Sequence, residues 1–229
     1  MNYLERYQNG EYEQVWKELQ DLEADVRQEP FYTHAKEVAT ETMRRVRRNC
    51  ERIISRLQKL GYVFGTFPDG TRRSYRAAPF TLPSNRMQAA CEELESEAGP
   101  LPLSLVAFWQ EVGAVDLVGM HPSWPNGLDP LVVDPPEGPL SDLFDEGEGI
   151  FVALAPDDLH KDNISGGDPY GFQLPNPSAD FLFMYERHDL LFVPYLRLAI
   201  LHWGGFPGLE GREIQFEPLE TLIADLEPF

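Results

Sequence analysis

The stretch THAKEVATETMRRVRRNCERIISRLQKL, residues 33 to 60, decides the fold because it predicts one long helix. Its apolar residues keep to one face over roughly seven turns, at 3.6 residues per turn. Gly61 follows directly, and glycine is the residue that most easily ends a helix. A second apolar stripe runs from Tyr12 to Val26. We therefore expect residues 1–62 to form a helical hairpin region.

The rest of the chain changes character. Residues 63–84 contain a Pro-Asp-Gly turn and two further prolines, which predict a hairpin or linker. Residues 85–229 open with two helical segments, Asn85–Ala98 and Leu105–Val112. They continue as short apolar runs that are typical of strands. These runs are 115–118, 131–133, 150–154, 181–185, 190–193 and 214–216, with helices expected at 195–203 and from Pro218. The pattern predicts an α+β fold, a helical N-terminal region followed by a mostly antiparallel sheet flanked by helices.

The charges are distributed unevenly. Net charge is −5 over residues 1–35, +8 over 36–86 and −22 over 87–229, within a total of −19. An acidic chain repels the phosphate backbone, which excludes a nucleic-acid partner and favours a basic one. Arg44, Arg48, Arg52 and Arg56 form an i, i+4 column on the long helix. This column is either a ridge for an anion or partner, or a face that is solvated or paired within the chain.

Several observations point to a reducing cytoplasm. The two cysteines, Cys50 and Cys91, lie on apolar helix stripes and predict buried thiols, not a disulfide framework. The first residues lack the basic and apolar segments of a signal peptide. The longest apolar run, 190–201, is too short to span a membrane and contains Pro194 and Arg197. We expect no membrane partner, and the oligomeric state stays open.

The sequence offers little for catalysis. Its five histidines are scattered, and motifs for zinc, phosphate or a nucleophilic serine are missing. The nearest candidate for a metal is the group Asp157, Asp158, His160 and Asp162, whose spacing fits neither an EF-hand nor a tetrahedral zinc site. We interpret it as a surface loop, and the glycine clusters 166–167 and 204–208 as turns. No enzyme activity, metal or cofactor is therefore expected.

A resemblance to a known family adds to this interpretation. The run EELESEAGPLPLSLVAFWQEVGAVDLVG, residues 92 to 119, followed by short strands and the closing segment PLETLIADLEPF, resembles the SUKH superfamily over about residues 85–229. The resemblance implies a helix-flanked sheet. It also implies a bacterial immunity protein that binds and neutralises a toxin, or an adaptor. The long basic helix lies outside the similar part.

The residues expected to bind a partner are acidic. Asp142, Asp145, Glu146 and Glu148 crowd into seven positions, where close carboxylates favour a basic surface. Trp124 is either an interface anchor or a core residue, because tryptophan is common in both places. We predict a non-catalytic, acidic protein-binding module. The alternatives are a metal-assisted hydrolase that uses Asp157, Asp158 and His160, or a structural or oligomerising protein.

Overall fold

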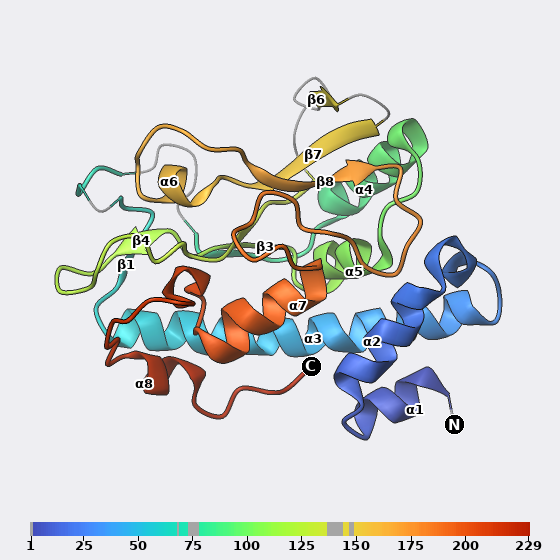
Figure 1. Cartoon of the computed structure of the whole chain (residues 1–229), viewed down its shortest axis with the longest axis horizontal. Coiled ribbons are helices and arrows are strands. Elements are labelled where there is room, and N and C mark those ends of the chain that lie inside the picture. Colours follow the sequence, from blue (N-terminus) through green and yellow to red (C-terminus); the bar gives the residue numbers. More distant parts are fainter. Residues whose placement is uncertain (1, 68, 73–77, 137–143, 147–148) are drawn as a thin grey trace.

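The computed structural model describes residues 2–67, 69–72, 78–136, 144–146 and 149–229 (Figure 1). It confirms the α+β class, with helices and small antiparallel sheets. The helices are α1 (Tyr3–Gln8), α2 (Tyr12–Asp21), α3 (Phe31–Lys59), α4 (Asn85–Ala98), α5 (Leu103–Glu111), α6 (Asp158–Lys161), α7 (Phe192–Arg197) and α8 (Leu219–Ile223). Shorter turns are the 3₁₀ segments η1 (Glu23–Arg27) and η4 (Pro207–Leu209) and the π-helical η3 (Leu198–His202).

Helix α3 forms the spine of the molecule, as its sequence predicts. It runs along the lower half of Figure 1, beneath α5 and α7. Its apolar stripe is buried, with Val38, Met43 and Ile53 fully covered. The indole Nε1 of Trp16 in α2 donates to Thr42 Oγ1 at 3.0 Å, which fixes α2 against the spine. Among the described residues, no helix is long and apolar enough to cross a membrane.

The strands form three small antiparallel sheets. They are β1 (Val63–Phe64), β2 (Phe80–Thr81), β3 (Ala114–Asp116), β4 (Gly119–Met120), β5 (Val132–Val133), β6 (Phe144–Glu146), β7 (Gly149–Ala155) and β8 (Tyr170–Leu174). The sheet orders are β1-β4, β2-β3-β5 and β6-β7-β8. The linker region thus supplies two strands that pair with later parts of the chain. Within the predicted hairpin the described residues form one antiparallel bridge, Thr66 to Arg72, and residues 68 and 73–75 lie outside the described part of the chain.

Three predicted strands were wrong. Residues 181–185 contribute only isolated bridges, Leu182 to Leu191 and Met184 to Gly171. Of the run 190–193, Phe192 and Val193 begin α7 and Leu191 forms only the isolated bridge, and 214–216 is irregular. The predicted helix over 195–203 is present as α7 and η3. Short apolar runs lack a period long enough to separate a strand from a buried helix, which explains these errors.

One apolar cluster joins the N-terminal helices to the rest of the chain. It includes Trp16 of α2, Val46 of α3, Phe108 of α5 and Phe192 of α7. Cys50 and Cys91 are free and buried, as the sequence predicts, and burial raises the pKa of the Cys50 thiol to about 12. The apolar faces of the N-terminal helices are therefore covered within the chain. The division into regions 1–62, 63–84 and 85–229 stays a prediction.

The arginine column of α3 is paired within the chain. Arg48 Nη2 lies 2.7 Å from one carboxylate oxygen of Glu227, and Arg52 Nη2 lies 2.8 Å from the other. Arg44 meets Glu111 at 3.2 Å, and Arg56 donates to the Leu222 carbonyl at 2.8 Å. The C-terminal segment, red in Figure 1, lies along this face of α3. Of the two interpretations of the column, the structure supports pairing within the chain.

Candidate functional site

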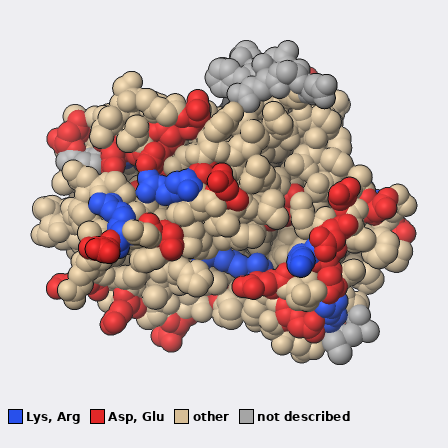
Figure 2. All heavy atoms as spheres, in the orientation of Figure 1, with Lys and Arg blue, Asp and Glu red and all other residues tan. Residues whose placement is uncertain are grey.

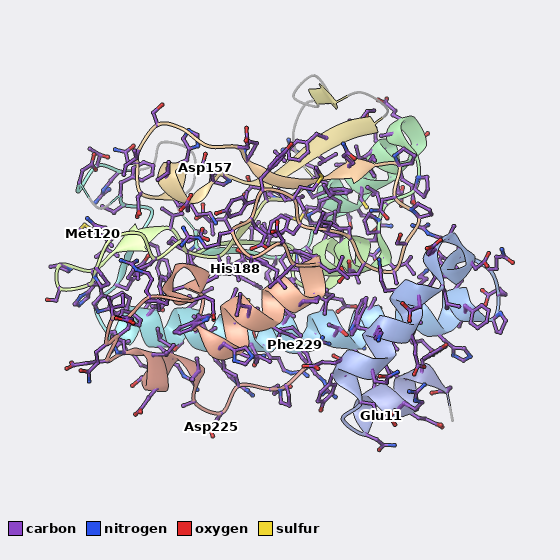
Figure 3. The ribbon with its side chains drawn as sticks, viewed as in Figure 1. Glu11, Met120, Asp157, His188, Asp225 and Phe229 are labelled. Atoms are coloured by element: carbon purple, nitrogen blue, oxygen red, sulfur yellow. The ribbon has the colours of Figure 1, made fainter. Side chains whose placement is uncertain are left out.

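A groove lies between α2 and the α7–η3 helix. It has a volume of about 1010 Å³, at the upper end of the range for ligand sites. Residues 10–21 line one wall, residues 190–202 the other, and Asp180, Pro228 and Phe229 complete it. In Figure 3, Phe229 is labelled between α7 and α2, and Glu11 lies toward the lower end of α2.

The wall from α7 and η3 is apolar. Both faces of this helix carry apolar residues, so those that do not reach the core stay partly exposed. The inner face supplies Phe192, Leu196 and Ile200, which are fully buried. The half-buried residues that line the groove are Leu190, Leu191, Pro194, Leu198 and Leu201. Covering such a strip releases ordered water and favours binding of another apolar surface.

The wall from α2 carries charge. Glu13, Lys17 and Asp21 lie at i, i+4 spacing, so they occupy one side of the helix. All three are exposed, and none forms an ion pair with any other described residue. Glu11 differs, because Arg6 Nη2 lies 2.9 Å from its carboxylate. The rim thus presents two unpaired carboxylates around one lysine.

Two charged side chains form part of the groove lining. Asp180 is buried, and its carboxylate accepts from Ser104 Oγ at 2.7 Å and from the Val193 backbone N–H at 3.0 Å. Burial raises the pKa of Asp180 to about 6, although these two donors oppose the rise. Arg197 donates through Nε to the carbonyl of Phe229. Its Nη2 is buried and has no hydrogen-bond partner among the described residues.

These features suit a peptide segment. An apolar wall contacts side chains, and two free carboxylates attract a basic residue. Acidic side chains outnumber basic ones in the lining, with Glu11, Glu13, Asp21 and Asp180 against Lys17 and Arg197, although Glu11 is paired with Arg6 and Asp180 is buried. The groove is therefore equipped to hold an apolar segment that carries positive charge.

The acidic cluster predicted from the sequence is only partly placed. Asp142 and Glu148 lie outside the described residues. Asp145 and Glu146 belong to β6, where they pair with Ile150 and Gly149 of β7. Figure 1 shows β6 at the upper edge, whereas the groove lies by α2 and α7. β6, which carries Asp145 and Glu146, is therefore separate from the groove.

Trp124 lies in an aromatic cluster. It is half-buried, and its ring centroid is 5.2 Å from that of Tyr62 and 5.0 Å from that of Phe216. Trp109, by contrast, is buried, and its Nε1 donates to the Asp134 carbonyl at 2.9 Å. Trp124 is thus packed against other aromatic rings and also partly exposed. It therefore shares features of the core residue and of the interface anchor, the two interpretations that the sequence offers.

The candidate metal group has other roles. Asp157 caps α6, where its Oδ1 accepts from the His160 backbone N–H at 2.7 Å and its Oδ2 lies 2.5 Å from His160 Nδ1. Asp158 pairs with Arg187. Among the residues that the structure places, no group of three or more His, Cys, Asp or Glu is arranged to hold a metal ion. The interpretation as a surface loop was wrong, since this segment is a helical turn.

That turn brings a buried ion pair into the core. Lys161 Nζ lies 2.8 Å from Asp129 Oδ1, with both side chains fully covered. Tyr170 donates its hydroxyl to Asp129 Oδ2 at 3.3 Å, and Arg187 Nε lies 3.6 Å from the same oxygen. A buried pair of this kind is stable only when its remaining polar atoms also find partners. The arrangement fixes α6 against β8.

The groove was missed because its residues are far apart in the sequence. One signal was present in the run LLFVPYLRLAILHW, residues 190 to 203, which is apolar all round when wound as a helix. Such a helix is either fully buried or leaves an apolar strip for a partner. Comparison with protein-family models, curated proteins and solved structures found no match to this chain.

Proposed function

We propose that this chain is a non-catalytic binding protein that holds a basic segment of another protein in the groove between α2 and α7. The resemblance to the SUKH superfamily suggests a specific form of this function, an immunity protein that neutralises a bacterial toxin in the cytoplasm. The observation that carries the proposal is the pair of unpaired carboxylates, Glu13 and Asp21, beside an apolar wall.

The distribution of charge supports a basic partner. Arg44, Arg48 and Arg52 pair with carboxylates of the chain itself, so the basic helix does not present free charge along this column. Figure 2 shows acidic side chains toward both ends of one face, with some Lys and Arg side chains among them and mostly uncharged residues between the two ends. A partner with a basic rim and an apolar centre complements this face.

The proposed mechanism is occlusion. The apolar wall of the groove supplies the contact area, and Leu198 and Leu201 lose their remaining exposure when it is filled. The negative charges of Glu13 and Asp21 attract the basic partner as it approaches the groove. Charges at the rim change association rates and salt dependence, whereas desolvated apolar contacts set how long the complex lasts.

The test uses a basic candidate toxin domain, such as one encoded beside this chain. Association is measured at low and moderate salt for the whole chain and for Glu13→Gln/Asp21→Asn. We expect slower association and a weaker salt dependence in the double variant. Glu92→Gln/Glu93→Gln on α4 removes the same charge from an exposed surface away from the groove and serves as the matched control.

A second set of substitutions separates the groove from the acidic cluster. It replaces Asp142, Asp145, Glu146 and Glu148 by the corresponding amides. If this set slows association and the groove variant does not, the partner binds at the cluster. If all three variants associate at the rate of the unchanged chain, electrostatic recognition is wrong for both surfaces.

A further inference from the structure

A second, smaller recess lies at the other end of the molecule from the groove. It adjoins the β1–β4 pair, near Met120 at the left of Figure 3. Its volume is about 100 Å³, well below the 300–1,000 Å³ that is typical of sites for whole small molecules. A recess of this size holds the head group of a single side chain. Its lining includes Tyr62, His121, Trp124, Asn126, Leu128 and Asp162.

The aromatic part of this lining is held rigidly. Trp124 lies 5.2 Å from Tyr62 with the rings inclined by 30°, and 4.8 Å from His121 at 33°. Phe206 and Phe216 pack edge-on against the same indole. The Tyr62 hydroxyl donates to the Leu117 carbonyl at 2.9 Å, so this ring is also fixed. Electron-rich rings attract cations, and fixed rings lose little entropy when they bind one.

Asp162 gives the recess a negative charge. It is half-buried and forms no ion pair with another described residue. Burial raises the pKa of Asp162, and the nearby Asp129 and Asp158 add to the rise, whereas a hydrogen bond from the Gly127 backbone and the charge of Arg187 oppose it. Arg212, which lies close by, instead donates through Nη1 to the carbonyls of Asn126 and Gly127, at 2.9 Å each. The Asp162 carboxylate is therefore partly desolvated and has no cation within ion-pair distance among the described residues.

We propose that this recess binds an alkylammonium group, with the ammonium against Asp162 and the adjacent carbons against Tyr62 and Trp124. A compact ammonium suits the small volume better than a planar guanidinium with its five donors. The group is supplied either by a lysine side chain of another protein or by a free amine. The inference rests on the recess alone and holds whether or not the groove has a partner.

The experiment follows the indole N–H signals of the uniformly ¹⁵N-labelled whole chain. The Trp124 signal is assigned as the one that Trp124→Phe removes. We expect n-butylammonium to move this signal saturably, and n-butanol, which has the same carbon chain without charge, to leave it in place. Equal binding of the alcohol, or no saturable shift with the amine, overturns the proposal.

Asp162→Asn tests the carboxylate. The amide keeps an acceptor for the Gly127 backbone N–H, so the fold is retained, and circular dichroism checks this. We expect affinity for n-butylammonium to fall about tenfold, which corresponds to about 1.4 kcal/mol. The exposed Asp168→Asn is the matched control and keeps the affinity. Unchanged affinity in Asp162→Asn overturns the proposal.

A further experiment with peptides identifies the source of the ammonium group. A short neutral peptide with one central lysine is compared with the same peptide carrying norleucine. Tighter binding of the lysine peptide than of n-butylammonium supports a protein side chain, and equal binding of the two supports a free amine. Binding of the norleucine peptide as tight as that of the lysine peptide overturns the assignment of an ammonium site.

Discussion

Two helices, α3 and α2, carry columns of charged residues at the same i, i+4 spacing, but within the part of the chain that the structure describes only the column of α3 is paired. The arginines of α3 meet Glu111, Glu227 and backbone carbonyls of the C-terminal segment. Glu13, Lys17 and Asp21 of α2 meet no ion-pair partner among the described residues. The spacing alone predicts a polar face in both cases. Whether that face is free depends on which distant segment folds over it, so a net charge says little about how much charge a partner encounters.

The pair Lys161–Asp129 is paired within the chain and fully buried. Breaking this pair should lower the unfolding free energy more than any other substitution that we predict. Lys161→Met leaves the Asp129 carboxylate covered, with Arg187 3.6 Å away. Removing one partner of a buried pair costs about 3–5 kcal/mol of unfolding free energy. Chemical denaturation measures this loss. The double variant Lys161→Met/Asp129→Asn should recover much of it, because asparagine tolerates the positive φ of 49° at this position, and a loss below about 1 kcal/mol in Lys161→Met would show that water reaches the pair.

Asp180, in the lining of the groove, predicts a dependence on pH. Its pKa is raised from 3.8 to about 6 by burial, so the folded chain holds this proton at pH values where the unfolded chain has released it. Unfolding free energy therefore falls as pH rises from about 4 to about 6, by about 3 kcal/mol from this group. Asp180→Asn should flatten this part of the stability curve.

Ser104→Ala sharpens the same test. The Ser104 hydroxyl donates to Asp180 at 2.7 Å and stabilises the charged form. Removing this hydroxyl should raise the pKa of Asp180 further. The pH interval over which the unfolding free energy falls should then extend to higher pH. A curve that Asp180→Asn leaves unchanged between pH 4 and 6 would mean that the carboxylate is hydrated in the folded chain.

The smallest expected effects concern the contact between α3 and the C-terminal segment. Asn49 is buried, and its side chain donates to the Glu227 carbonyl and accepts from the Glu227 N–H, each at 2.8 Å. Asn49→Ala should cost about 1–3 kcal/mol, because it leaves buried backbone groups unpaired. Glu227→Gln removes only partly exposed ion pairs with Arg48 and Arg52 and should cost about 0–1 kcal/mol. Thermal unfolding at low and high salt distinguishes the two variants, because only the ion pairs lost in Glu227→Gln are screened by salt. Equal losses of stability in Asn49→Ala and Glu227→Gln would contradict this ranking.

Local patterns predicted the helices well. The apolar stripe of residues 33–60 and the glycine after it match α3, and Ser84, whose hydroxyl accepts from the Met87 N–H at 3.2 Å, begins α4 where the sequence indicates. These signals are contained within a few turns of one helix. The strand β8 was missed, and the run 214–216 was misassigned, because Phe216 joins an aromatic cluster and not a sheet.

The sequence by itself determined the α+β class, the long basic helix, the buried cysteines and the excess of acidic residues, since periodicity, capping and composition are local properties. Only the tertiary structure decided which charged side chains form ion pairs within the chain. It placed the C-terminal segment on the arginines of α3, buried Lys161 against Asp129, and left Glu13 and Asp21 beside an apolar wall. The physical reason is that ion pairing depends on distances of a few ångströms between residues far apart in the chain, which spacing along the sequence does not specify.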